Sequence, residues 1–394
     1  MPGTPIFPGV FIEEVATGVR TIEGVATSVA AFVGTFPQGP LDRPVLVLSL
    51  ADFVRVFGDP DEASAACDGV RRFFLNGGTA AYVVRVGAAT AAALCGARAD
   101  GTGLFALYSV DLFNVLCLPG AADLPPAELR AVYTAAAAYC EERRAFLLVD
   151  IPETVRDAAA MEAWIVENEA LRHRNAAVYF PRLRVADPLR PGQSRDVAAS
   201  GALAGLYARS DVARGVWKAP GGTALPLRGV EEPAHALTDG ESATLAARGV
   251  NGLRTVLDHG TVAWGARTLA GIDAPASDWK YVPVRRLALY LEESVYRGTE
   301  WVVFEPNAEP LWAEVRRRVG VFLHDLFRQG AFQGSTPGEA YTVRCGRNTM
   351  SQEDIDRGIV NIEIGFAPLR PAEFVFIRIG QWRGARTRPH QPIP

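Results

Sequence analysis

From residue 28 to residue 181 the chain alternates short apolar runs with longer amphipathic segments. The apolar runs are bounded by Gly or Pro, which is typical of strands covered on both faces. The expected strands lie at residues 28–34, 44–50, 81–87, 113–120, 144–152 and 175–181, and the expected helices at 50–58, 64–78, 125–144 and 155–174. This alternation predicts an α/β domain over residues 25–272, with a mixed sheet and flanking helices.

Three other segments of this domain have a different composition. Residues 87–105 are low in complexity, and residues 184–240 are rich in Pro and Gly, so both are predicted to be surface loop insertions. Residues 251–257 and 261–268 are strand-like and flank the sequence Asp-His-Gly-Thr. They predict a β-hairpin that closes at this turn.

After residue 272 the pattern changes and predicts a second, α+β unit over residues 273–371. Apolar residues recur at helical spacing in two stretches, and a strand-like run follows at residues 358–368. The second helix is expected to begin with Asn307 as its N-cap and to end before Gly330. The residues that define the two helical faces are Leu287, Leu291 and Val295, then Leu311, Val315, Val319, Phe322 and Leu326.

The same unit begins with an aromatic-rich stretch that contains several arginines and glutamates. Its aromatic side chains are expected to fill the core of the unit: Trp279, Tyr281, Tyr290, Tyr296, Trp301, Phe304 and Trp312. Glu292 and Glu293 follow one another on a helix, diverge by about 100° and cannot share a substrate. We therefore expect a solvated face on which Arg285, Arg286 and Arg297 hold these carboxylates.

The two ends of the chain each contain a strand-like run with no neighbouring strand. These runs lie in an N-terminal arm, residues 1–24, and a C-terminal arm, residues 372–394. A lone strand leaves backbone N–H and C=O groups unpaired, so each run must pair with something. The residues concerned are Val10, Phe11, Ile12, Glu13, Glu14 and Val15, and Phe374, Val375, Phe376, Ile377, Arg378 and Ile379.

Composition and charge exclude several classes of function. With 49% hydrophobic and 21% charged residues, the 394-residue chain has an ordinary globular composition, and its length predicts two or three domains. A formal charge of −4 argues against nucleic-acid binding. The sequence has no run of about 18 apolar residues, so no membrane insertion is expected. Acidic residues near the N-terminus argue against a signal peptide, and we expect cytoplasmic assembly.

Motifs for catalysis or cofactor binding are weak. The five cysteines show no Cys-x-x-Cys spacing, the five histidines are scattered, and no phosphate-binding loop is present. Residues 101–106, Gly-Thr-Gly-Leu-Phe-Ala, match a loose dinucleotide pattern outside a strand–turn–helix unit and are interpreted as a loop. The sequence therefore predicts no catalytic residues, no metal and no cofactor.

One helical face carries positive charge. Arg317, His324 and Arg328 lie opposite the apolar face of the helix that follows Asn307. This face is either simply exposed to solvent or a docking face for an acidic partner.

Residues 279–381, from WKYVPVRRLALYLEESVY to EFVFIRIGQ, resemble the C-terminal domain of contractile phage tail sheath proteins. Upstream stretches resemble successive segments of the same family in the same order, so the resemblance covers nearly the whole chain. These stretches are PGVFIEEV, TSVAAFVGTFPQGP, FFLNGGTAAYVVRVG, GLYARSDVARGVWKAPGG and VAWGARTLAG. Two positions depart from the pattern: Pro283 stands where relatives usually carry Asn, and Phe327 where Trp is frequent.

The resemblance implies a subunit of a helical sleeve that surrounds an inner tube in a phage tail or a phage tail-like particle. It implies an outer α/β domain, a tube-proximal C-terminal domain, and arms that exchange strands with neighbouring copies. The implied partners are many copies of the same chain, the inner tube protein, and baseplate and terminal cap proteins. Arg317, His324 and Arg328 are then the expected inner-tube contact. Two alternatives stay open: an α/β enzyme with an added oligomerisation domain, and a non-contractile shell protein.

Overall fold

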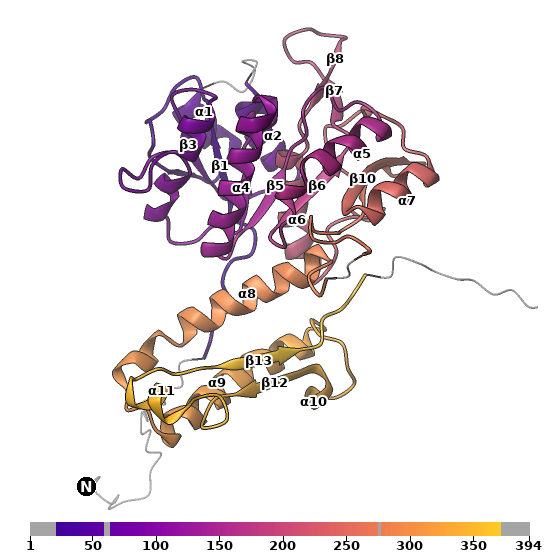
Figure 1. Cartoon of the computed structure of the whole chain (residues 1–394). Coiled ribbons are helices and arrows are strands. Elements are labelled where there is room, and N and C mark those ends of the chain that lie inside the picture. Colours follow the sequence, from indigo (N-terminus) through magenta and orange to yellow (C-terminus); the bar gives the residue numbers. More distant parts are fainter. Residues whose placement is uncertain (1–20, 59–63, 275–276, 372–394) are drawn as a thin grey trace, which may run out of the picture.

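The computed structural model describes residues 21–58, 64–274 and 277–371. An α/β body contains the strands and helices up to residue 264, and a smaller unit of helices and one hairpin lies below it in Figure 1. A single long helix, α8 (Val282–Gly298), runs between the two. The predicted arm strands, Val10 to Val15 and Phe374 to Ile379, lie outside the described residues.

The body is built on an eight-stranded mixed sheet with the order β11-β10-β6-β5-β4-β1-β3-β2. The six inner strands are parallel, and an antiparallel strand closes each edge. The strands are β1 (Ala30–Gly34), β2 (Val45–Val47), β3 (Ala81–Arg85), β4 (Val115–Cys117), β5 (Phe146–Val149), β6 (Ala176–Phe180), β10 (Val250–Val256) and β11 (Gly260–Trp264). The predicted mixed α/β fold is confirmed, as is the hairpin between β10 and β11.

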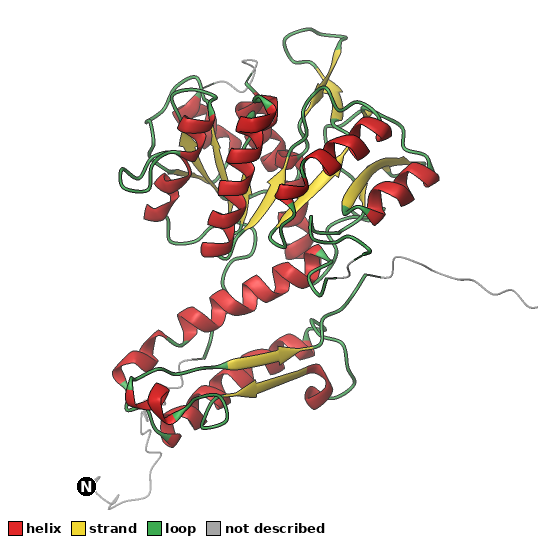
Figure 2. Ribbon diagram, viewed as in Figure 1, coloured by secondary structure: helices red, strands yellow, loops and turns green. Residues whose placement is uncertain are grey.

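Helices cover both faces of this sheet, which is why its strands read as continuous apolar runs. Figure 2 shows the strands in yellow between the helices in red. One face packs against α3 (Ala91–Cys95), η1 (Gly103–Ser109), η2 (Ala121–Asp123), α4 (Pro126–Glu142), α5 (Ala158–Glu167), η3 (Glu169–Leu171) and α7 (Asp239–Ala247). The opposite face packs against α1 (Leu50–Phe57), α2 (Ala65–Leu75) and α6 (Ser200–Arg214).

Residues 184–240 differ from the predicted loop insertion, because this segment contributes a core helix. Eleven of the fifteen residues of α6 are buried. A small sheet, β8-β7-β9, precedes and follows it, with β7 (Leu183–Ala186), β8 (Ser194–Val197) and β9 (Glu232–Pro233). The Pro- and Gly-rich stretches that suggested loops, residues 184–196 and 218–240, lie on either side of this helix, which packs closely through glycines of its own. The second predicted insertion, 87–105, likewise contains α3 and the start of η1, with Leu94 and Leu104 buried.

The contact between α2 and α6 depends on glycines in the first two turns of α6. A Cβ added to Gly201 would lie 2.1 Å from the carbonyl oxygen of Gly69, and one added to Gly205 would lie 2.3 Å from that of Phe73. Real Cβ atoms do not approach backbone oxygens so closely, so the two helix backbones can touch only because these side chains are absent.

The lower unit has its own hydrophobic core, formed by the end of α8, by α9 (Glu309–Arg328) and by a two-stranded hairpin. The hairpin pairs β12 (Tyr341–Arg344) with β13 (Glu363–Phe366). Short segments complete the unit: η4 (Glu300–Phe304), α10 (Pro337–Ala340) and α11 (Gln352–Asp356). The predicted apolar face of α9 is confirmed, since Leu311, Val315, Val319, Phe322 and Leu326 are all buried.

Asn307 is not the N-cap of α9, as had been predicted. The cap position is Ala308, and the Asn307 amide instead donates to the carbonyl oxygens of Ile355 (3.3 Å) and Ile359 (3.0 Å). Its Oδ1 accepts a hydrogen bond from Trp312 Nε1 at 2.7 Å. Asn307 therefore ties the start of α9 to the loop around α11 and does not satisfy the helix's own first turn.

We expect Gly201→Ala to destabilise the protein by about 1–3 kcal/mol, because the new methyl group must push α6 away from α2. The matched control is Gly320→Ala in the interior of α9, where an added Cβ meets nothing within 4 Å. That change should stabilise by about 0.5–1 kcal/mol through helix propensity. Chemical denaturation of both variants measures the difference. Equal effects of the two substitutions would show that α2 and α6 are not in tight contact.

Candidate assembly interface

Helix α8 belongs to two hydrophobic cores at once. Val282 and Leu289 pack in the core beneath the sheet, whereas Leu287, Leu291 and Val295 pack in the core of the lower unit. A rigid helix shared in this way transmits any displacement of one unit to the other. Pro283 lies in its first turn, where the missing N–H has no intrahelical partner to lose.

A buried ion pair fixes α8 to the body. Arg286 donates to both carboxylate oxygens of Asp211 on α6, at 2.9 and 2.7 Å, and both side chains are 3% exposed. Its second terminal nitrogen also donates to the carbonyl oxygen of Thr27 at 2.8 Å, and its guanidinium lies 4.8 Å from the ring of Tyr207. Burial by itself lowers the pKa of Arg286, but the Asp211 carboxylate outweighs this effect and the net shift is upward.

Arg285, the neighbouring residue, holds a different part of the body. Its Nε donates to Oδ1 of Asn175 at 2.6 Å, and one terminal nitrogen donates to Glu292 at 3.1 Å. The guanidinium also lies 4.7 Å from the ring of Trp279. Desolvation is the main cause of its lowered pKa, and Glu292 opposes that shift.

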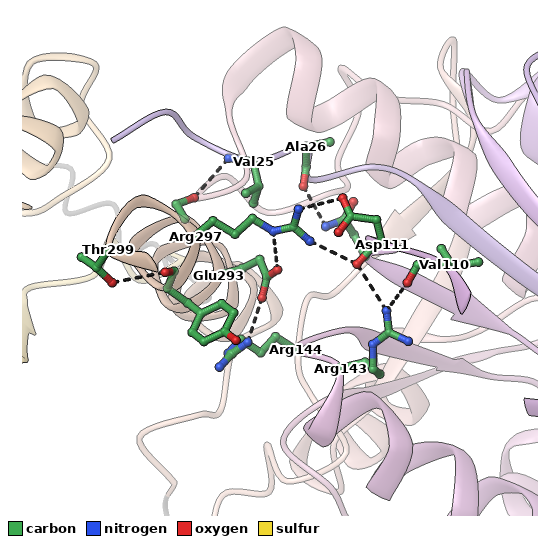
Figure 3. A network of polar contacts seen from close by, with 12 residues as sticks. Val25, Ala26, Val110, Asp111, Arg143, Arg144, Glu293, Arg297 and Thr299 are labelled. Atoms are coloured by element: carbon green, nitrogen blue, oxygen red, sulfur yellow. Dashed lines mark hydrogen bonds and ion pairs between the residues drawn. The ribbon is translucent and has the colours of Figure 1, made fainter. Parts of the chain in front are cut away.

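Further along α8, a charged network crosses to the loop before β4 (Figure 3). Glu293 accepts hydrogen bonds from Arg144 (2.9 Å) and from Arg297 (2.6 Å). Arg297 also donates to the Asp111 carboxylate at 2.7 Å, and this contact lowers the pKa of Asp111. The segment before β1 joins the same network, since the backbone N–H of Val25 donates to Ser294 Oγ at 3.2 Å.

This junction corrects the expectation of a solvated face on α8. Glu293 is 8% exposed, and Arg285 and Arg286 are buried as well. Arg286 pairs with Asp211 and not with either glutamate. Two of the expected pairs form within α8, Arg285 with Glu292 and Arg297 with Glu293, whereas the carboxylate that holds Arg286 comes from a segment far away along the chain. A cavity of about 20 Å³ among Arg144, Arg286 and Glu293 has room for one water molecule.

The predicted tube-contact residues lie together on the outer face of α9. Arg317, His324 and Arg328 are all exposed. Arg317 is not a free cation, because it donates to Glu314 at 2.7 Å, and Arg317 together with Arg318 lowers the pKa of Glu314 to about 2. Helical phase thus gathers the three side chains, with part of the positive charge neutralised.

The expectation that the aromatics of this unit fill its core is confirmed for Tyr290, Trp301 and Trp312 and is wrong for the other four. Trp279 and Tyr281 are half-buried and lie outside that core. Trp312 is buried, but Tyr296 is 56% exposed and Phe304 is 87% exposed. Tyr296 packs against Arg144, whose guanidinium lies 4.6 Å from the ring centre. Phe304 follows Val303, which is 78% exposed, on the short turn η4. The sequence did not predict that Val303 and Phe304 are exposed, because an apolar and aromatic stretch of this kind is typical of a buried core segment.

The hairpin of the lower unit is the candidate acceptor for further strands. Within the described residues, β12 and β13 pair only with each other over the full named strands, so each presents one free edge. The predicted arm strands fall outside residues 21–371, and their pairing is therefore a proposal below.

The body contains the crevice where α/β sheets of this topology usually bind ligands, and its own helix fills it. The crevice lies beyond the carboxyl ends of β1 and β4, where the strand order reverses. A Cβ added to Gly34 would lie 2.9 Å from Ala66 Cβ, and one added to Gly69 would lie 2.9 Å from the ring of Pro119. The first turns of α2 thus pack directly on the strand ends.

A buried carboxylate occupies the next position along this edge. Asp150, after β5, accepts hydrogen bonds from the backbone N–H (2.9 Å) and Oγ (2.5 Å) of Ser200 at the start of α6. Burial raises the pKa of Asp150, and the hydrogen bonds from Ser200 oppose that rise. The Asp150 carboxylate therefore occupies the N-terminus of α6, where the helix dipole favours a negative charge.

The described residues contain neither a metal-ligand cluster nor a membrane-spanning helix. In residues 21–58, 64–274 and 277–371, no three His, Cys, Asp or Glu side chains gather as metal ligands would. Among the helices of those ranges, none has the length and apolarity that crossing a bilayer requires.

Comparisons with known proteins match this architecture. The phage tail sheath protein central domain matches residues 88–269, and the phage tail sheath C-terminal domain matches residues 274–381. The sheath complex of the extracellular contractile injection system PVC, in its contracted state, is 30% identical, with a TM-score of 0.77 over 97% of this chain and 99% of that one. The helical sheath of the anti-feeding prophage, also contracted, is 30% identical, with a TM-score of 0.75 over 96% of this chain and 100% of that one.

A more distant structure shares the fold: a sheath tail protein from Desulfitobacterium hafniense, 11% identical, with a TM-score of 0.57 over 85% of this chain and 93% of that one. No curated protein matches the sequence. Fold and matches together define a sheath-type subunit, an α/β body joined by one helix to a smaller α+β unit. The chain belongs to the phage tail sheath family.

We expect Asp211→Ala to destabilise the protein by about 3–5 kcal/mol, because it leaves the buried Arg286 guanidinium without its counter-ion. Replacing both partners, as Asp211→Leu with Arg286→Met, should cost markedly less, since no uncompensated charge remains. Glu153→Ala removes one partner of an exposed pair and should change stability by less than about 1 kcal/mol. Denaturant unfolding compares the three. If the single and double variants at the buried pair lost equal stability, the pair would not be the anchor of α8.

Proposed function

We propose that this chain is the structural subunit of the contractile sheath of a phage tail-like contractile injection system. The observation that carries the proposal is the extent of the likeness. It spans 97% of this chain and 99% of a sheath subunit in a contracted assembly, so nearly every element has a counterpart there. If the chain were an enzyme with an added oligomerisation domain, only that added domain would be expected to resemble a sheath subunit.

In this proposal many copies assemble helically around an inner tube protein, between a baseplate and a terminal cap. The α/β body is the outer domain, residues 25–272, and residues 273–371 form the tube-proximal domain. The heterologous contacts between copies do not close on themselves, and a helical sleeve is their natural product.

The arms connect the copies. Val10 to Val15 and Phe374 to Ile379 add as strands to the hairpin of a neighbouring subunit, which satisfies the free backbone groups on both sides. The free edges of β12 and β13 support this assignment. Backbone pairing of this kind is insensitive to the rotation of the domains around it, so the lattice stays connected while the subunits move.

Contraction follows from two packings of the same subunits that differ in free energy. The assembled sleeve is held extended on its tube, and release at the baseplate lets the subunits pass to a shorter, wider lattice with more buried contact. A difference of about a few kcal/mol per subunit suffices, because it is summed over every copy. The anchored helix α8 makes each subunit stiff enough to transmit that force.

The sheath assignment and the arms can be tested together. Negative-stain microscopy of the full chain, co-produced with its tube and baseplate proteins, should show long striated sleeves. Deletion of residues 1–20 or 373–394 should leave a folded subunit with normal circular dichroism that no longer forms sleeves. Discrete particles or closed shells from the full chain would contradict the sheath function. Intact sleeves from either truncation would contradict strand exchange alone.

The face of α9 that carries Arg317, His324 and Arg328 is the proposed contact with the inner tube. Replacing all three by Glu should prevent assembly on tubes, because like charges then face the tube surface. The control reverses two exposed arginines of the body, Arg55 and Arg156, and should assemble normally. Co-sedimentation of sheath with tubes measures both. Normal assembly of the triple variant would remove α9 from the interface.

A further inference from the structure

The most exposed apolar pair in the lower unit is held outward by a fixed turn. Val303 and Phe304 are 78% and 87% exposed on η4. Two adjacent large apolar side chains on a surface are unfavourable in water, so a segment that covered both would be stabilised by their burial.

This turn cannot simply rotate them inward. Trp301 Nε1 donates to the carbonyl oxygen of Gly298 at 3.0 Å, and the guanidinium of Arg318 lies 4.2 Å from the Trp301 ring centre. Trp301 and Val302 both pack against the core of the lower unit. Rotating η4 to bury Phe304 would expose these two residues and break both contacts.

The described chain starts beside this turn. Ile22 is 7% exposed in the same core, and a Cβ added to Gly298, two residues before η4, would lie 2.7 Å from its side chain. From Gly298 to Phe304 the chain advances by about 12 Å at the 3₁₀ rise of about 2 Å per residue. An extended chain covers about 3.3 Å per residue, so four or five residues before Ile22 reach across η4.

The residues in that position have suitable chemistry. Residues 17–20 read Thr-Gly-Val-Arg, with Val19 as the apolar side chain and Arg20 as the single charge. Glu300 and Glu305, at the two ends of η4, are both exposed. A segment with one valine and one arginine therefore complements an apolar pair flanked by carboxylates.

We propose that residues 17–20 of the same chain pack over Val303 and Phe304, so that the N-terminal arm begins from a fixed position on η4. This deepens the proposed sheath function, because that position sets the direction in which Val10 to Val15 leave toward a neighbour. The docking itself lies within one chain. It is present in an isolated subunit as well as in a sleeve.

A disulfide between introduced cysteines tests the contact in the full-length chain. Val19→Cys with Phe304→Cys should form an intramolecular bond on mild oxidation, because a disulfide requires Cβ atoms about 3.5–4.5 Å apart. The product should run as a monomer on a non-reducing gel, with the linked peptide identified by mass spectrometry. The matched control is Val19→Cys with Leu257→Cys, whose second site is 85% exposed in the turn between β10 and β11, and it should not form this bond. The linked peptide separates the introduced pair from the five native cysteines.

A ladder of linked chains would show that a neighbour's arm covers η4 and would overturn the proposal. An absence of any bond between positions 19 and 304 would overturn it as well. Phe304→Ser supplies a second readout, since limited proteolysis within residues 1–20 should become at least about tenfold faster while the thermal midpoint stays unchanged. An unchanged cleavage rate would contradict the docking. If the intramolecular disulfide formed but the full-length chain never assembled into sleeves, the sheath function would be contradicted and the docking on η4 would still be supported.

Discussion

The architecture depends on one constraint: α8 must stay fixed to the α/β body while it also forms part of a second core. The bidentate pair between Arg286 and Asp211 meets this requirement, because a buried guanidinium is tolerated only where a carboxylate faces it. Hydrophobic contact alone would let the helix slide or rotate. The two parallel hydrogen bonds from the planar Arg286 guanidinium to the Asp211 carboxylate fix both the position and the direction of α8.

The other contacts at the junction extend this anchor along the helix. Arg285 reaches Asn175 at the start of β6, and Arg297 reaches the loop that carries Asp111. The segment before β1 runs through the same junction and adds the contact between Val25 and Ser294. Three separate parts of the body thus contact α8, so the body and this helix form one rigid unit.

The α/β body shows how a topology often used for ligand binding becomes a scaffold. Gly34 and Gly69 let the first turns of α2 lie directly on the strand ends, and Asp150 supplies the carboxylate that α6 needs at its N-terminus. Both features fill with the chain's own atoms the places where a ligand would sit in other members of this fold class. The surfaces for which we propose contacts are in the lower unit: the outer face of α9, the hairpin edges and η4.

The sequence by itself determined the eight strands of the main sheet, four of the helices that cover it (α1, α2, α4 and α5), the apolar face of α9 and the turn between β10 and β11, because each follows from local periodicity or from turn residues. Its motifs also carried the family resemblance. Tertiary structure alone decided that α6 is a core helix, since its burial depends on the close contact that Gly201 and Gly205 make with α2. It alone paired Arg286 with Asp211, 75 residues away, and left Phe304 exposed. Neither burial nor the partner of a charge is a property of a residue's neighbours in sequence, because both depend on which distant segments the fold brings alongside.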